Sequence, residues 1–143
     1  MKMKLWHWVV ALVVGVPIVM MLTASPAPDI PQTAIDMATS TIMMDPQVVD
    51  ATVVVDGRDV GLAIVVRRST SPEYGRQLAD NYARLLSGQA SFYSDDKRLT
   101  EGPSRDYLGS LWDHYDLRVV VAFDADNVLV QGAKARTAAA IRW

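Results

Sequence analysis

The chain has 143 residues, of which 50% are hydrophobic and 21% charged, and a formal net charge of −2 at pH 7. This length accommodates one domain, and the composition is that of a globular chain rather than a disordered one. Lys2 and Lys4 are the only charges in the first 28 residues, so the other 12 of the 14 basic residues face 16 acidic ones. Because that remainder is acidic and its arginines are scattered, we expect no nucleic-acid partner.

The chain has no cysteine. Disulfides, thiolate catalysis, iron–sulfur clusters and cysteine-bound zinc are therefore excluded, as is the lipid-modified cysteine of a bacterial lipoprotein. Neither G-x-G-x-x-G nor G-x-x-x-x-G-K-[ST] occurs, so the sequence predicts no nucleotide site and no cofactor.

The N-terminal segment is the clearest feature of the sequence. After Lys2 and Lys4, residues 5–24 are mostly apolar and are interrupted chiefly by His7. About 20 such residues in a helix span the hydrocarbon core of a bilayer, and the two lysines favour a cytoplasmic N-terminus. We therefore expect residues 1–25 to be a transmembrane signal anchor that contacts the lipid bilayer through residues 5–24.

A cleaved signal peptide is the alternative. Cleavage needs small residues one and three positions before the cut. Ala24 has Leu22 two residues before it, and Ser25 and Ala27 are each followed by proline. We therefore expect an uncleaved single-pass protein of the bacterial inner membrane, with its C-terminal domain in the periplasm or outside the cell. Secretion after cleavage is the other possibility.

Residues 26–46 are expected to be a linker and a lead-in to the domain. Three prolines between positions 26 and 31 favour an extended, stiff spacer. Residues 32–45 fit either a strand, because of TSTIMM, or a helix, because Ile35, Ala38 and Ile42 have helical spacing.

Residues 47–143 are expected to form the folded domain, which begins with a β-hairpin. The runs QVVDATVVVD and DVGLAIVVR are rich in β-branched residues, and Gly57 between them suits a tight turn. The second run has no polar face, which predicts a central strand. One face of the first strand is predicted to be buried; it comprises Val49, Ala51, Val53 and Val55.

An amphipathic helix is predicted next. Thr70 or Ser71 caps its start, and Gly88 is its expected end. Its apolar stripe is expected to pack on the sheet. Residues 89–110 have no sustained periodicity, and we expect them to form a long loop with, at most, one short helix.

Two further strand-like runs, LRVVVAFD and NVLVQGAKARTAAAIRW, flank the turn DADN and predict a second hairpin. Gly132 is expected to mark a bulge or a bend in the last strand. The predicted fold is therefore α+β: an N-terminal transmembrane helix, then a small two-layer domain of order ββ-α-ββ. Its sheet is expected to be mostly antiparallel, with one amphipathic helix packed on one face.

The stretch WDHYD, at positions 112–116, contains the main candidates for a metal or acid–base site. If it opens the third strand, His114 and Asp116 share a face and Asp113 points away. That leaves His114 and Asp116 as weak candidate metal ligands, too few for a catalytic zinc site. The stretch is therefore expected to be the entry to a strand.

These features predict a non-catalytic binding or structural accessory of the cell envelope, with a protein partner that the sequence does not identify. One alternative is a periplasmic binder of a small ligand or metal, released by signal cleavage. A second is a small hydrolase that uses His114 as general base. No catalytic residue is assigned.

Overall fold

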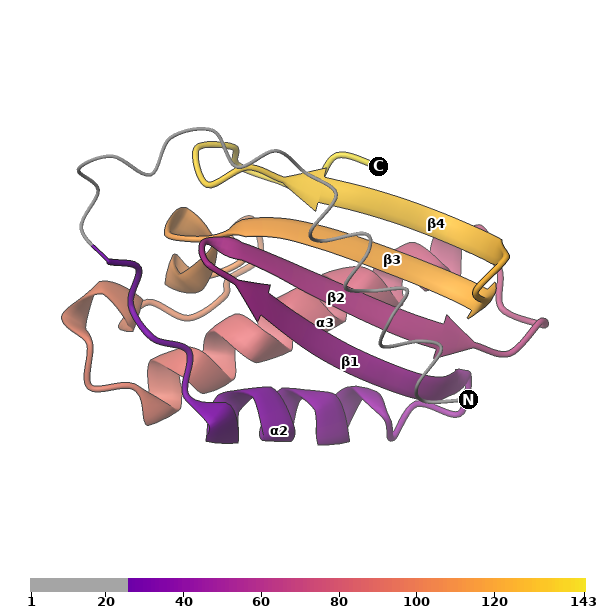
Figure 1. Ribbon diagram of the computed structural model, residues 1–143, viewed down its shortest axis with the longest axis horizontal. Helices are drawn as coiled ribbons and strands as arrows, with labels where there is room; N and C mark the ends of the chain where they lie inside the picture. Colours follow the sequence, from indigo (N-terminus) through magenta and orange to yellow (C-terminus); the bar gives the residue numbers. More distant parts are fainter. Residues whose placement is uncertain (1–25) are drawn as a thin grey trace.

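The computed structural model describes residues 26–143, which form a four-stranded sheet with two helices on one face (Figure 1). The two short 3-10 helices precede the third strand. In chain order the elements are α2 (Gln32–Ile42), β1 (Val48–Asp56), β2 (Asp59–Val66), α3 (Pro72–Tyr93), η1 (Lys97–Leu99), η2 (Ser110–Asp113), β3 (Asp116–Asp124) and β4 (Asn127–Lys134).

The strands lie in the order β1-β2-β3-β4. Both hairpins, β1–β2 and β3–β4, are antiparallel, as predicted, but β2 and β3 pair in parallel. The order ββ-α-ββ was predicted without a crossover helix between paired strands, and this part of the prediction is wrong. A parallel pair needs a long connection, and the connection between β2 and β3 contains α3, η1 and η2. The α+β class and the two layers are confirmed.

The prediction of a single helix in the domain is wrong, because the ambiguous residues 32–45 contain α2. Its buried positions are Ala34, Ala38 and Ile42, which are 0–4% exposed and belong to the core. The helix lies beside α3, and Thr39 Oγ1 is 2.7 Å from the buried hydroxyl of Tyr82. The helical spacing was therefore the informative pattern in this segment.

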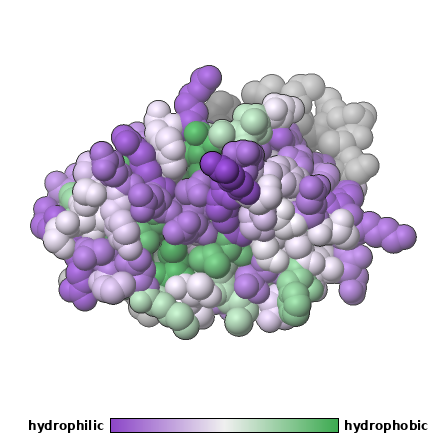
Figure 2. Space-filling view, turned by 180° about the vertical axis from the view of Figure 1, so that it is seen from behind, coloured by the Kyte–Doolittle hydropathy of each residue, from purple (hydrophilic) through white to green (hydrophobic). Residues whose placement is uncertain are grey.

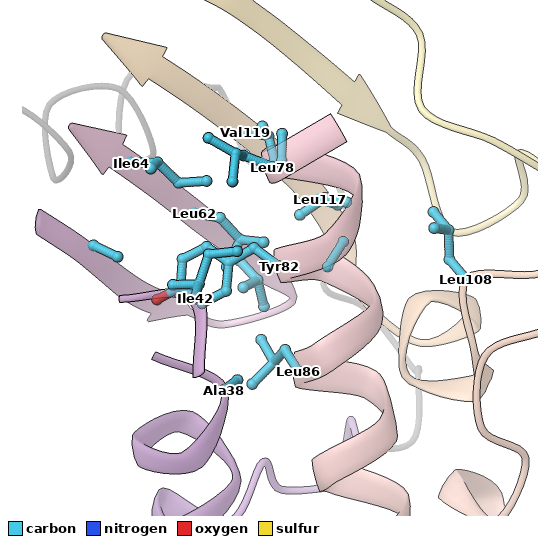
Figure 3. Packing of buried hydrophobic residues seen from close by; sticks show 14 of the residues in the cluster. Ala38, Ile42, Leu62, Ile64, Leu78, Tyr82, Leu86, Leu108, Leu117 and Val119 are labelled. Atoms are coloured by element: carbon cyan, nitrogen blue, oxygen red, sulfur yellow. The ribbon is translucent and has the colours of Figure 1, made fainter. Parts of the chain in front are cut away.

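The core lies between the two helices and one face of the sheet. Leu62 and Leu117 extend from the sheet toward Tyr82 and Leu86 of α3, and Ile42 of α2 closes the same layer (Figure 3). Burial of such side chains contributes on the order of 1.5–3 kcal/mol each. β2 pairs with a strand on both sides, so the prediction of a central strand is confirmed.

The buried face of β1 differs in part from the prediction. Ala51 and Val53 pack on the core, but Val49 is 53% and Val55 is 42% exposed. A register irregularity between Val48 and Asp50 lets Val48 take the buried position instead. A bulge shifts the alternation of side chains locally, which is why the simple pattern fails there.

Helix α3 begins as predicted and ends later than predicted. Ser71 is its N-cap, and its hydroxyl accepts a hydrogen bond from the Tyr74 amide at 3.2 Å. The helix continues through Gly88 to Tyr93, since the buried stripe continues with Ala90, which is 0% exposed. Tertiary burial outweighs the roughly 1 kcal/mol that glycine costs within a helix.

The segment before α2 lies against the domain. The hydroxyl of Tyr115 donates to the Pro28 carbonyl at 2.7 Å, and Arg98 donates to the Pro26 carbonyl at 2.9 Å. Within residues 26–143, no helix is long and apolar enough to cross a membrane. The predicted anchor, residues 1–25, lies outside the described residues.

Candidate functional site

Only Asp116, the last residue of the stretch WDHYD, belongs to β3. Trp112 and Asp113 belong to η2, His114 follows as its C-cap, and β3 begins only at Asp116. Trp112 is fully buried, and its indole Nε1 donates to the Ala83 carbonyl of α3 at 2.9 Å. The burial and hydrogen bond of Trp112 hold Trp112 and Asp113 in a 3-10 helix. The prediction that the side chains of residues 112–116 alternate as in a strand is therefore wrong.

Three acceptor groups of this stretch have hydrogen-bond partners within the domain. The His114 carbonyl accepts from Arg58 Nη1 at 3.2 Å, and Asp116 Oδ1 accepts from the Arg136 amide at 2.8 Å. Asp113 accepts from the Tyr107 hydroxyl. Within the described part of the chain, no group of three or more histidine or acidic side chains is arranged to hold a metal ion. The candidate ligands His114 and Asp116 therefore gain no third partner there.

Lys134 is a buried cation that the sequence analysis missed. It is 4% exposed, and its Nζ donates to the Trp112 carbonyl at 2.8 Å and to the Ala135 carbonyl at 3.3 Å. Burial lowers the pKa of Lys134, an effect that the charges of Asp113 and Asp116 oppose. Lys134 lies four residues after the buried Val130 in the same strand, and side chains an even number of residues apart point to the same face of a sheet. This spacing in the sequence could have placed Lys134 on the inner face. Its contacts stabilise the η2 turn rather than form a reactive site.

A groove of about 590 Å³ lies on the helical face, between the C-terminal half of α2 and the middle of α3. Its apolar lining includes Ile42, Met44, Leu78 and Leu85. Seen from the helical side, hydrophobic residues gather in the middle of the face and toward its lower edge, with polar residues above them (Figure 2). The full lining is Thr41, Ile42, Met44, Asp45, Leu78, Asn81, Arg84, Leu85, Gly88, Gln89 and Pro103.

Met44 lines this groove, and two further methionines, Met37 and Met43, are exposed within or directly after α2. Met37 is 42%, Met43 is 38% and Met44 is 79% exposed. Methionine is flexible and polarisable, so it adapts to the apolar surface of a partner. The sequence analysis missed this surface because it left residues 32–45 undecided between helix and strand.

The charged residues that line the groove are paired within the domain. Arg84 Nε donates to Asp80 Oδ2 at 2.7 Å, and its guanidinium also donates to the carbonyls of Ser104, Arg105 and Tyr107. These bonds hold the segment that contains Pro103 against α3, so one wall of the groove is preformed.

Asp45, the other charged residue that lines the groove, also has hydrogen-bond partners within the domain. Its carboxylate accepts from the Gln47 amide at 2.8 Å and from the Tyr74 hydroxyl. The hydrogen bond to Asp45 raises the pKa of Tyr74, so this phenol stays neutral near pH 7. The groove contains no histidine and no lysine. Its lining is an apolar surface with polar edges that are fixed by hydrogen bonds.

No protein-family model matches this chain, and comparisons with curated proteins and with solved structures found no similar protein. Its function is therefore inferred from its own side chains and their arrangement.

Proposed function

We propose that the protein is a single-pass, membrane-anchored accessory of the bacterial cell envelope that binds another protein through the groove between α2 and α3. In this proposal residues 5–24 span the inner membrane, and the domain lies on its outer side. The observation that carries the proposal is the apolar groove lined by Ile42, Met44, Leu78 and Leu85. The two charged residues in its lining, Arg84 and Asp45, already have hydrogen-bond partners within the domain. Isolated exposed apolar residues are common on surfaces, whereas a contiguous apolar patch favours a binding role.

The expected occupant is an amphipathic helix of the partner, with an apolar ridge flanked by uncharged polar residues. The groove lies between two helices, a geometry that accepts the ridge of a third helix. Asn81 and Gln89 supply neutral amides in the lining, while Arg84 and Asp45 are held by partners within the domain. A strongly charged partner surface would therefore gain little here.

Site-specific photo-crosslinking in intact membranes tests this proposal. A photoreactive residue replaces Met44 in the groove or, as the control, Arg76, which is exposed on α3 and lies outside the groove lining. We expect a discrete crosslinked protein from position 44 and none from position 76. Equal products from both positions would contradict a groove-specific interaction.

Gly88 offers a matched pair of competing variants. A Cβ atom at Gly88 would lie 3.5 Å from Pro103 Cδ, an ordinary contact, so Gly88→Ala fits. Gly88→Leu extends further into the groove that Gly88 lines. We expect Gly88→Leu to abolish the crosslink from position 44 and Gly88→Ala to keep it. A crosslink that survives Gly88→Leu would mean that the partner binds elsewhere.

The anchor is tested separately by the mass of the mature protein in the membrane and soluble fractions. An intact N-terminus in the membrane fraction is the expected result. Loss of residues 1–25 from the mature protein would overturn the anchor and favour a released protein.

A further inference from the structure

The sheet has a second face, which points away from α2 and α3 (Figure 1). Strand alternation and register define it as a grid of side chains from four strands. Its centre contains the small or apolar residues Gly61, Ala63 and Val120 together with one charged residue, Arg118, and its other polar members lie at the margins. Each row contains one residue from each strand, in the order β1, β2, β3 and β4. The first three rows are Asp50, Val65, Ala122 and Val128; Thr52, Ala63, Val120 and Gln131; and Val54, Gly61, Arg118 and Ala133. The last row contains only Asp56, Asp59 and Asp116, from β1, β2 and β3.

The central residues of this second face are buried. Ala122 is 0%, Ala63 is 1%, and Val54 and Val120 are each 7% exposed. None of the four belongs to the core cluster that α2 and α3 cover. A sheet with two apolar faces needs a layer on each of them, and both helices of the described chain lie on the other face.

We propose that residues 5–22 of this same chain cover the second face of the sheet whenever the segment is not inserted in a bilayer. The fit in length supports this occupant. Eighteen residues in a helix extend about 27 Å, and the nine residues of β1 or β3 extend about 30 Å. The segment therefore reaches from one end of the strands to the other.

The point at which the described chain begins also supports it. Pro28 lies at the end of the sheet where β3 starts, because its carbonyl accepts from Tyr115, the residue directly before β3. Figure 1 shows residues 26–31 at that end, beside the turn between β1 and β2. A segment that continues from Pro26 along the strands passes over the rows in order, from the Asp116 row to the Asp50 row.

The small residues in the middle of the second face and an acidic residue at its far end also suit residues 5–22 and the lysines before them. Gly61, Ala63 and Ala122 make the middle of the face shallow, so a helix can approach the sheet closely. Such an orientation brings Lys2 and Lys4 to the end of the sheet that carries Asp50. Opposite charges would then meet where the apolar segment ends.

This inference goes beyond the proposed function. Insertion of residues 5–22 into the membrane would uncover the second face, and their withdrawal would cover it. The covered form keeps an apolar segment of 18 residues out of water before the chain reaches a bilayer.

The absence of cysteine makes disulfide mapping direct, because every thiol is then an introduced one. Ala63→Cys, in the middle of the face, is combined in the full chain with one cysteine at position 12, 13, 14 or 15. These four consecutive positions make one helical turn, so at least one of them must point toward the sheet. Ala138, exposed in the C-terminal segment, supplies the control thiol in place of position 63.

In detergent-free buffer under mild oxidation, we expect a monomeric, internally crosslinked product from one or two of the four pairs. We expect at least tenfold less from the same positions paired with Ala138→Cys. Absence of the product from all four pairs in folded protein overturns the inference, and circular dichroism of each variant checks the fold. A disulfide-linked dimer of the single variant Ala63→Cys would identify a second copy as the occupant and overturns it too.

Phospholipid vesicles separate this inference from the proposed anchor. When the chain is added to vesicles before oxidation, we expect the internal crosslink to fall at least tenfold as residues 5–22 insert. A crosslink that persists in protein that does not insert leaves the inference standing and contradicts the anchor.

Discussion

Replacement of Gly109 by alanine is the most demanding test of the described packing. Gly109 is buried directly before η2 and has a φ of 113°. A Cβ atom added there would lie 1.9 Å from Ser87 Oγ and 2.7 Å from Ser87 Cβ. These distances are far below van der Waals contact, so the loop and α3 would have to move apart.

The loss of folding free energy in Gly109→Ala has two parts. A non-glycine residue in this region of backbone space is strained by on the order of 1–3 kcal/mol. Overpacking of a close contact adds about 1–3 kcal/mol. We therefore expect Gly109→Ala to lower the free energy of unfolding by roughly 4 kcal/mol, a large share of the about 5–15 kcal/mol typical of a domain.

Urea titration of the purified full chain in a mild detergent measures the change. Far-UV circular dichroism follows the helices, and tryptophan fluorescence includes the buried Trp112 next to the altered turn. Gly102→Ala is the matched control, because a Cβ there would meet no atom within 4 Å. We expect this control to stay within about 0.5 kcal/mol of the wild type.

A double-mutant comparison separates the two parts of the cost. In a Ser87→Gly background both obstructing atoms are gone, so Gly109→Ala should cost only the backbone strain of about 1–3 kcal/mol. An equal cost in both backgrounds would refute the close approach of Ser87 to Gly109. A Gly109→Ala variant as stable as Gly102→Ala would refute the whole argument.

Three further predictions concern buried and charged groups. Ser87→Ala should stabilise the fold by about 1 kcal/mol in urea titration, because the buried Ser87 hydroxyl has no hydrogen-bond partner among the described residues; a loss of stability would reveal a partner. Lys134→Ala should destabilise by about 3 kcal/mol by the same assay, since it leaves the Trp112 carbonyl unpaired and opens a cavity, and a change below about 0.5 kcal/mol would contradict this. Arg98 lowers the pKa of Asp96 to about 2, so the stability that this carboxylate adds is present above pH 3.8 and is lost as the pH falls toward 2. The stability difference between wild type and Asp96→Asn, followed by acid titration, should therefore be constant above about pH 4 and shrink below it.

Local sequence patterns were enough for the hairpins and for the start of α3. The turn around Gly57, the β-branched runs and the Ser71 cap act within a few residues of one another, so their physics is visible in the sequence. The DADN turn is of the same kind, since Asp124 Oδ1 accepts from the Asp126 amide at 2.9 Å. The central place of β2 followed from its two apolar faces.

Patterns that depend on distant contacts were misjudged. Of the bulge or bend predicted at Gly132, the bulge is wrong, because the irregular pairing in β4 lies nearer its start. A Cβ at Gly132 would lie 2.7 Å from Ile141 Cγ2, so a distant residue approaches closely there. The predicted last strand ends at Lys134, and Arg142 returns to pair with Ala133. In each case a residue far along the chain decides what a local motif does.

The candidate site shows the same division. The sequence by itself determined the class of the domain, its hairpins, its apolar N-terminal segment and the chemistries that its composition excludes, because these depend on residue types and short-range spacing. Only the tertiary structure decided that β2 and β3 run parallel, that α2 lies beside α3 to form a groove, and that Trp112 and Asp113 belong to a 3-10 helix before β3. Those outcomes depend on which buried surfaces meet across the fold, and packing of that kind outweighs the weak preferences of a single segment.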